Sequence, residues 1–396
     1  MKRIYFSISL ILFAVSGFAQ WTTLSSGTTE SLYSVFFADP NTGFAVGSNG
    51  TIQKTANAGT SWVALTSNTT NSLNSVFFTS TNTGYAVGDY GTIIKTINGG
   101  TTWTAQTSGT TWGLSAVCFT STNTGFAISW GGEILKTSNG GSTWTIQASG
   151  TTNSLNSISF TDANNGYIVG YDKAIFKTVN GGTSWTALDT TGFPFSNLMS
   201  VYFTDVNTGY IAGPQGNSIL KTINGGTSWT QQTNGTAVGL WAVYFTSANT
   251  GYALGNNGII LKTINGGTNW TVLSSGTPNF LQSVFFTDAN TGYAVGGLGT
   301  ILKTTGGVGI SEFNNTENKI NIYPNPASDL ITLNIDNKKN ADLSLTIYNE
   351  IGALVKSETL KQNQKQVSIK DLSNGVYLVV IKSDEFTESR KLIIQK

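Results

Sequence analysis

The sequence predicts an all-β protein in which a seven-bladed β-propeller, closed by its own N-terminal strand, precedes a small Ig-like antiparallel β-sandwich. Tryptophan recurs every 41 residues, apart from one step of 44, and each interval holds four short runs rich in β-branched and aromatic residues. Four strands per unit with a period of roughly 40 residues are typical of propeller blades. The recurring residues are Trp21, Trp62, Trp103, Trp144, Trp185, Trp229 and Trp270.

Residues 1–19 have the pattern of a secretory signal peptide. Lys2 and Arg3 precede an apolar run over residues 4–15, and a small-x-small cleavage pattern ends at Ala19. No cysteine follows this pattern, so a lipoprotein anchor is not expected, and no later stretch resembles a transmembrane segment. We therefore expect the mature chain to begin at Gln20 and to pass through the periplasm.

The propeller is expected to span residues 20–305 and to close through its two ends. The repeat region opens with a lone fourth strand at Trp21 and ends with only three strands, the last of which stops before Thr305. A strand supplied by the N-terminus would complete the seventh blade and leave no open sheet edge.

One nine-residue phrase, seen as KTINGGTTW at Lys95–Trp103, recurs between the third and fourth runs. Its glycines supply positive φ and its Asn can bond the local backbone, so it predicts a hairpin anchored by Trp. The phrase resembles the Asp box of the bacterial neuraminidase repeat, a fold-forming hairpin rather than a catalytic motif. We expect the lysine that begins each of these repeats to pack its aliphatic chain along the blade and to leave its ammonium group in water. The family's Asp is replaced by Asn98, Asn139, Asn180, Asn224 and Asn265.

Two of the four loop sets are regular and two are irregular. The turns between first and second runs begin with Asp or Ser, which can cap their own turns, and they share one face with the Asp-box hairpins. The fourth-to-first and second-to-third loops share the opposite face, which we call the irregular face and predict to bind a ligand. Alternatively, its aromatic residues plug the central channel or pad the loops. The candidates are Tyr33, Tyr90, Trp112, Trp130, Glu133, Tyr171, Asp172, Phe193, Phe195, Trp241 and Phe280.

Composition argues against several kinds of chemistry. The chain has no His, one Cys and a formal net charge of +1. Histidine-based triads, histidine metal ligands and internal disulfides are therefore not expected, and neither is a nucleic-acid partner. No Gly-rich phosphate loop is present, so no cofactor is predicted, and no metal site is predicted either.

A catalytic function remains only as an alternative. The resemblance to neuraminidases implies an arginine cluster in the active site, but no Arg lies between Arg3 and Arg390. Other glycoside hydrolases need a carboxylate pair, which would have to come from the acids of the irregular face. These acids are Glu30, Asp89, Glu133 and Asp172.

The whole repeat region is similar to propellers of the photosystem II stability and assembly factor-like type. The resemblance rests on seven Asp-box units and on the phrase GYAVG…GTIxKTxNGGxTW, seen here at residues 84–103. It implies a protein-binding propeller. In the photosynthetic members a basic patch contacts a membrane protein, and the Arg residues for such a patch are absent here.

The C-terminal residues have a different composition. A short connector over residues 306–318 leads to a charged, strand-rich segment over residues 319–396 that lacks Trp. This segment resembles the C-terminal sorting domain of the type IX secretion system of Bacteroidota, on the residues Tyr323–Pro326, Ile347–Val355, Gly375–Tyr377 and the ending KLIIQK. The resemblance implies recognition by the type IX secretion machinery, whereas an ordinary adhesion-type sandwich would not be sorted.

Together these observations predict a monomeric, non-enzymatic binding propeller that is secreted or displayed on the outer cell surface. Its partner would be a protein or a glycan held by the irregular face. The alternatives are a glycoside hydrolase on the same face and a purely structural surface protein.

Overall fold

The computed structural model describes residues 21–216, 218–305, 320–335, 343–349, 354–361, 366–382 and 387–396. The predicted signal peptide and the predicted connector, residues 306–318, lie outside these residues. The chain divides into two compact units between Gly306 and Gly307.

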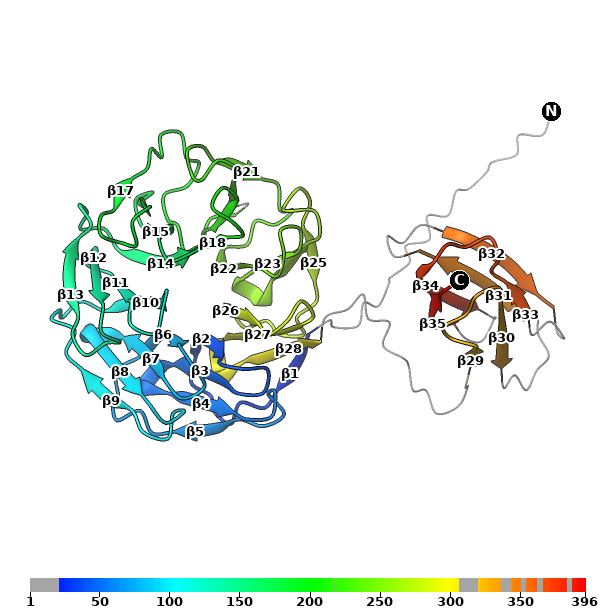
Figure 1. The fold of residues 1–396 in the computed structure, drawn as a ribbon, viewed down its shortest axis with the longest axis horizontal. Helices are drawn as coiled ribbons and strands as arrows, with labels where there is room; N and C mark the ends of the chain where they lie inside the picture. The colour runs from blue at the N-terminus through cyan, green and yellow to red at the C-terminus, as the bar shows by residue number, and fades with distance from the viewer. Residues whose placement is uncertain are drawn as a thin grey trace, which may run out of the picture. The chain divides into compact units, whose positions relative to one another are not determined.

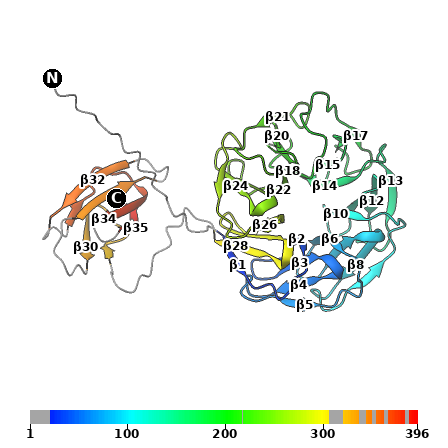
Figure 2. The ribbon, with the colours of Figure 1, turned by 180° about the vertical axis from the view of Figure 1, so that it is seen from behind.

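The first unit is a ring of seven four-stranded antiparallel sheets, which confirms the predicted propeller (Figure 1). The first strand of each blade lies nearest the ring centre and the fourth lies outermost, and Figure 2 shows the same order from behind. Six blades follow the chain as β2 (Leu32–Phe37), β3 (Gly43–Gly47), β4 (Ile52–Thr55), β5 (Val63–Leu65); β6 (Leu73–Phe78), β7 (Gly84–Gly88), β8 (Thr92–Thr96), β9 (Thr104–Gln106); β10 (Leu114–Phe119), β11 (Gly125–Ser129), β12 (Glu133–Thr137), β13 (Thr145–Ala148); β14 (Leu155–Phe160), β15 (Gly166–Gly170), β16 (Ile175–Thr178), β17 (Thr186–Ala187); β18 (Ser200–Phe203), β19 (Gly209–Ala212), β20 (Ile219–Thr222), β21 (Thr230–Gln232); and β22 (Leu240–Phe245), β23 (Gly251–Gly255), β24 (Ile260–Thr263), β25 (Thr271–Leu273).

The seventh blade is closed by the start of the chain, as predicted. It contains β26 (Leu281–Phe286), β27 (Thr291–Gly296) and β28 (Ile301–Thr305), and its fourth strand is β1 (Thr22–Leu24). β1 pairs antiparallel with β28, with Thr22 opposite Lys303 and Leu24 opposite Ile301. Pairing the two ends removes the exposed edge that an open ring would present.

Short 3₁₀ turns follow the second strand in four blades, on the irregular face. They are η1 (Ser48–Gly50), η2 (Asp89–Gly91), η3 (Asn256–Gly258) and η4 (Gly297–Gly299).

Aromatic stacking joins each blade to the next. Tyr85 of β7 stacks on Phe119 of the following blade, with ring centroids 4.1 Å apart, and Trp144 packs edge-on against the same Phe119. Phe78 explains why β7 opens with a glycine, because a Cβ on Gly84 would come within 2.5 Å of the Phe78 ring. The recurring Trp and Phe are therefore parts of the core between blades.

The Asp-box turns are structural, as predicted. Asn98 Oδ1 accepts a hydrogen bond from the backbone N–H of Thr102 at 2.9 Å, and Asn98 Nδ2 donates to Thr102 Oγ1 at 2.9 Å. The backbone N–H of Gly100 donates to Thr96 Oγ1 at 2.9 Å. Asn98 thus holds the turn closed through its own side chain.

The expectation that the repeated lysine ammonium groups lie in water was wrong. Lys54 Nζ donates to the backbone oxygen of Gly99 in the next blade at 2.7 Å, and Lys95 Nζ donates to that of Gly140 at 2.6 Å. Equivalent contacts are made by Lys136, Lys177, Lys221 and Lys303. All seven lysines also lie 5.3 to 5.6 Å from the centroid of an aromatic ring in the second strand of their own blade. The ammonium groups therefore tie neighbouring blades together.

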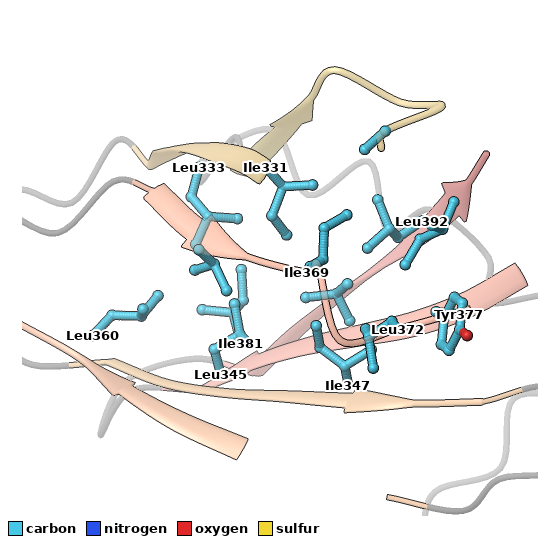
Figure 3. Close-up of a cluster of buried hydrophobic side chains, with 14 of the residues drawn as sticks. Ile331, Leu333, Leu345, Ile347, Leu360, Ile369, Leu372, Tyr377, Ile381 and Leu392 are labelled. Atoms are coloured by element: carbon cyan, nitrogen blue, oxygen red, sulfur yellow. The ribbon is translucent and has the colours of Figure 1, made fainter. Parts of the chain in front are cut away.

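The second unit is a two-sheet β-sandwich, also as predicted. Apolar side chains such as Ile331 and Leu333 from one sheet and Leu345, Ile347 and Ile381 from the other form its buried core (Figure 3). The sheets are β29 (Ile320–Tyr323), β30 (Leu330–Ile335), β33 (Gln366–Ser368), and β32 (Leu354–Leu360), β31 (Leu343–Tyr348), β34 (Gly375–Lys382), β35 (Thr387–Ile394).

Candidate functional site

The two kinds of loop lie on opposite faces of the propeller. On the regular face, the Asp-box turn contacts the first-to-second turn, since the backbone N–H of Gly99 donates to the backbone oxygen of Asn82 at 2.9 Å. On the irregular face the two variable loop sets meet, since the backbone N–H of Asp89 donates to the backbone oxygen of Ser72 at 3.0 Å. The variable residues are therefore gathered on one side of a rigid ring.

A cavity of about 480 Å³ opens among the first strands on the irregular face. Each blade contributes the residue that directly follows a fully buried leucine. In six blades this leucine begins the first strand, and in the fifth blade Leu198 and Met199 lie just before β18. Loop residues supply the rest of the lining. The residues that follow these leucines are Tyr33, Asn74, Ser115, Asn156, Met199, Trp241 and Gln282, and the loop residues are Ser72, Asp89, Trp130, Tyr171, Asn256 and Phe280. We call these thirteen residues the central cavity.

Five of the residues predicted from the sequence line the central cavity together. Trp130 and Tyr171 belong to neighbouring blades and are 41% and 42% exposed, so each keeps a large apolar surface open to a ligand. The Trp130 ring lies against Gly113, where a Cβ would come within 2.5 Å of the ring. The other three are Tyr33, Trp241 and Phe280.

The remaining aromatic candidates do not line the central cavity. Phe195 is buried, and Phe193 packs against the same apolar cluster between the fourth and fifth blades, so these two pad the loop. Tyr90 and Trp112 are exposed on the irregular face but outside the cavity lining. The Trp112 ring covers Gly131 instead.

The two acidic candidates also lie outside the central cavity. Glu133 lines a separate depression of about 750 Å³ beside Gln147. Asp172 Oδ2 accepts a hydrogen bond from Asn153 Nδ2 at 3.3 Å. Asp89 is the one carboxylate among the residues that line the central cavity, so the carboxylate pair of a glycoside hydrolase is not assembled there.

Hydrogen bonds fix the polar side chains of the central cavity. Asn74 Nδ2 donates to Asp89 Oδ1 at 3.1 Å and to the backbone oxygen of Leu114 at 3.0 Å, which uses both amide hydrogens. Trp241 Nε1 donates to Asn256 Oδ1 at 2.7 Å.

Asn156 and Ser115 are held in the same way. Asn156 Nδ2 donates to the backbone oxygen of Leu198 at 2.9 Å, and Ser115 Oγ donates to that of Leu155 at 2.6 Å. These side chains therefore present fixed acceptor atoms to the cavity.

Sequence reasoning missed Asn74, Asn156, Asn256 and Gln282 as lining residues. For Asn74, Asn156 and Gln282 a signal was present, because the residue after the repeated leucine takes six identities in seven blades while the leucine does not change. A strand residue of a rigid repeat that varies in this way points into a shared space rather than into the repeated core.

Two chemical limits follow for the described part of the chain. No Lys or Arg lines the central cavity, so it offers no counter-charge to an anion. Among the described residues, no cluster of three or more carboxylate or thiol side chains has an arrangement that could hold a metal ion. In the same residues, no helix has the length and apolar character needed to cross a membrane.

Two family models match the chain. The model described as photosynthesis system II assembly factor YCF48 matches residues 14–105, 60–146, 109–192, 141–231 and 190–279. The model described as secretion system C-terminal sorting domain matches residues 321–395. No curated protein matches the chain.

Solved structures with the same fold include two of YCF48. One, of YCF48 bound to a D1 peptide, is 19% identical with a TM-score of 0.64 and covers 73% of this chain and 98% of its own. YCF48 from Cyanidioschyzon merolae is 18% identical with a TM-score of 0.62, covering 72% and 98%.

The chain is also similar to PorZ of Porphyromonas gingivalis, described as an essential bacterial surface component of the type IX secretion system. This likeness has 10% identity and a TM-score of 0.56, and it covers 91% of this chain and 59% of PorZ. The sorting domain marks the present chain for export by type IX secretion to the cell surface or the medium.

Proposed function

The chain belongs to the family described as photosynthesis system II assembly factor YCF48, and on that premise we propose that it is an exported binding protein that captures a partner in its central cavity. The proposal takes the propeller, residues 20–305, as a monomeric binding module and residues 319–396 as the part that the type IX machinery reads. Catalysis is not part of it.

The observation that carries the proposal is the contrast between the two faces of one repeated scaffold. The blades repeat their core, their Asp-box turns and their lysine contacts almost unchanged, but they contribute a different side chain to the central cavity in most blades. A rigid scaffold whose repeats vary around a concave site is typical of a binding protein.

The YCF48 structures support a binding role in general terms. One of them holds a D1 peptide, so a propeller of this family can bind a macromolecular partner. The photosynthetic role itself does not transfer, because this chain has no Arg between Arg3 and Arg390.

Binding by the exported full-length protein tests the proposal. The protein is screened against arrayed glycans and surface proteins, and each interaction found is measured again with Trp130→Ala and Tyr171→Ala. We expect these variants to weaken binding by about tenfold or more, which corresponds to about 1.4 kcal/mol.

Tyr90→Ala and Trp112→Ala are matched controls, because both remove an exposed aromatic side chain of the irregular face outside the cavity. Binding that survives the two cavity variants and fails in these controls would place the site elsewhere and refute the proposal.

A further inference from the structure

We infer that the central cavity is a site for a neutral carbohydrate, a sugar unit or short oligosaccharide that lies against Trp130 and Tyr171. This inference rests on the proposed function and names its ligand class. The volume of about 480 Å³ falls within the roughly 300–1,000 Å³ that is usual for small-ligand sites.

The charges of the cavity lining favour a neutral ligand. No cationic side chain lines the cavity, and its one carboxylate, Asp89, already accepts a hydrogen bond from Asn74. An anionic sugar or a phosphate would lose its hydration here without gaining a counter-ion, which is costly. The repeated lysines do not supply one, because none of them lines the cavity and six of them donate to carbonyl oxygens between blades.

The polar atoms that the lining offers to the cavity are mostly hydrogen-bond acceptors. The donors of Asn74, Asn156 and Ser115 are used within the protein, the second amide hydrogen of Asn156 by Met199 Sδ at 3.7 Å, so these residues offer acceptor oxygens to the cavity. A hydroxyl-rich ligand suits them, because every hydroxyl carries one donor hydrogen and can still accept. The side chain of Gln282, which has no hydrogen-bond partner among the described residues, adds both a donor and an acceptor.

Two exposed aromatic side chains give the cavity a surface on which a sugar ring can stack. Trp130 and Tyr171 come from equivalent loops of the third and fourth blades, and both remain about two-fifths exposed. The backbone N–H of Trp130 donates to the backbone oxygen of Gly113 at 2.9 Å, and Ser154 Oγ donates to the backbone oxygen of Trp130 at 2.9 Å. A pre-ordered aromatic surface beside fixed polar groups can stack on the C–H face of a sugar ring at small entropic cost.

Titration calorimetry and tryptophan fluorescence on the exported full-length protein test the inference. The neutral probes are cellotriose, maltotriose, mannotriose and triacetylchitotriose. Trigalacturonate represents anionic sugars, tetralysine represents cationic peptides, and tetraalanine represents peptides without charged side chains. We expect at least one neutral trisaccharide to bind at millimolar concentration or better, and trigalacturonate and tetralysine not to bind.

Variants locate the bound sugar. Trp130→Ala is expected to weaken binding about tenfold or more, and Gln282→Ala about threefold or more. Gln282→Ala also guards against a folding artefact, because its side chain makes no hydrogen bond to any residue that the structure describes. Tyr90→Ala should bind like the parent.

The outcomes separate the two proposals. If no neutral trisaccharide binds, or if only trigalacturonate, tetralysine or tetraalanine binds, the carbohydrate inference is overturned. The proposed function then stands if Trp130→Ala abolishes binding of whichever of these three probes, or of the screened surface proteins, does bind the parent. If a sugar binds but neither Trp130→Ala nor Gln282→Ala weakens it, both proposals fail.

Discussion

Lys54 of the first blade donates a hydrogen bond from Nζ to the backbone oxygen of Gly99 in the second blade, 2.7 Å away. Equivalent bonds are made by five further lysines around the ring, but the aromatic residue beside the lysine is Tyr in some blades and Phe in others. For Lys95 of the second blade, the receiving oxygen is that of Gly140 in the third blade, and it also accepts from the hydroxyl of Tyr85 at 2.8 Å. In the first blade the residue equivalent to Tyr85 is Phe44, which has no hydroxyl.

This difference predicts unequal effects of removing the lysine. Lys54→Met leaves the oxygen of Gly99 without its side-chain donor and should lower the free energy of unfolding by about 2 kcal/mol. Lys95→Met leaves the Tyr85 bond in place and should cost about half as much. Thermal and denaturant unfolding of the full-length protein measure both. Lys173→Met is the control, because Lys173 has no side-chain hydrogen bond among the described residues, and equal losses in Lys54→Met and Lys95→Met would contradict the argument.

The N-terminal strand should be essential for the propeller. Trp21 is 1% exposed and packs edge-on against Phe286 and Tyr252, so it fills the core between the sixth and seventh blades. Trp21→Ala should cost about 3–5 kcal/mol, and deletion of residues 21–26 should open the ring and destabilise every blade. Limited proteolysis and thermal unfolding measure this, with the exposed Thr23→Ala as the control. A deletion variant that melts at the parent temperature would refute closure by β1.

The repeat pattern was sufficient to predict the blades and their closure, because each blade follows from local signals. A tryptophan at a fixed step, a Gly-Gly turn and alternating β-branched residues act within about 40 residues. The lysine contacts could not be predicted in this way. Lys54 and its acceptor Gly99 are 45 residues apart and meet only because neighbouring blades stack in a particular register.

The lining of the central cavity was predictable in part for a similar reason. Variable loops indicated the irregular face, and Trp130 and Tyr171 lie where those loops reach the cavity. Phe195 belongs to the longest of these loops, which folds its aromatic side chains back into the core, and composition alone does not distinguish a padded loop from an open one. Asn74 was missed because it lies on a strand, where a polar residue facing a central channel resembles one facing solvent.

The Asn of the Asp box should be replaceable by the family's Asp. Asn98→Asp keeps the oxygen that accepts from Thr102 N–H, and the Thr102 hydroxyl can donate to the second carboxylate oxygen. We expect a change in unfolding free energy within about 0.5 kcal/mol, whereas Asn98→Ala loses these bonds and should cost about 1–2 kcal/mol. Denaturant unfolding of the two variants decides between them, and an Asp variant as unstable as the Ala variant would show that the amide hydrogens are needed.

Acid should weaken the turns of the regular face that begin with Asp. The backbone N–H of Asn290 donates to Asp288 Oδ1 at 2.7 Å and lowers the pKa of that carboxyl, and the side-chain amide of Asn165 does the same for Asp162. A carboxyl whose pKa is lower in the folded state stabilises the fold above its unfolded pKa of about 3.9, and this stabilisation is lost as the pH falls towards the folded value.

The chain itself suggests the matched variant, because the equivalent turns at Ser80, Ser121 and Ser247 are capped by a hydroxyl that does not titrate. The double variant Asp162→Ser, Asp288→Ser should therefore unfold near the parent temperature at pH 7 but lose less of that temperature than the parent between pH 4 and about pH 2.5. Asp172→Ser removes an acid of the irregular face outside these turns and is the control. If the double variant and the parent lose the same number of degrees over this range, the carboxylate caps do not contribute to the acid sensitivity of the fold.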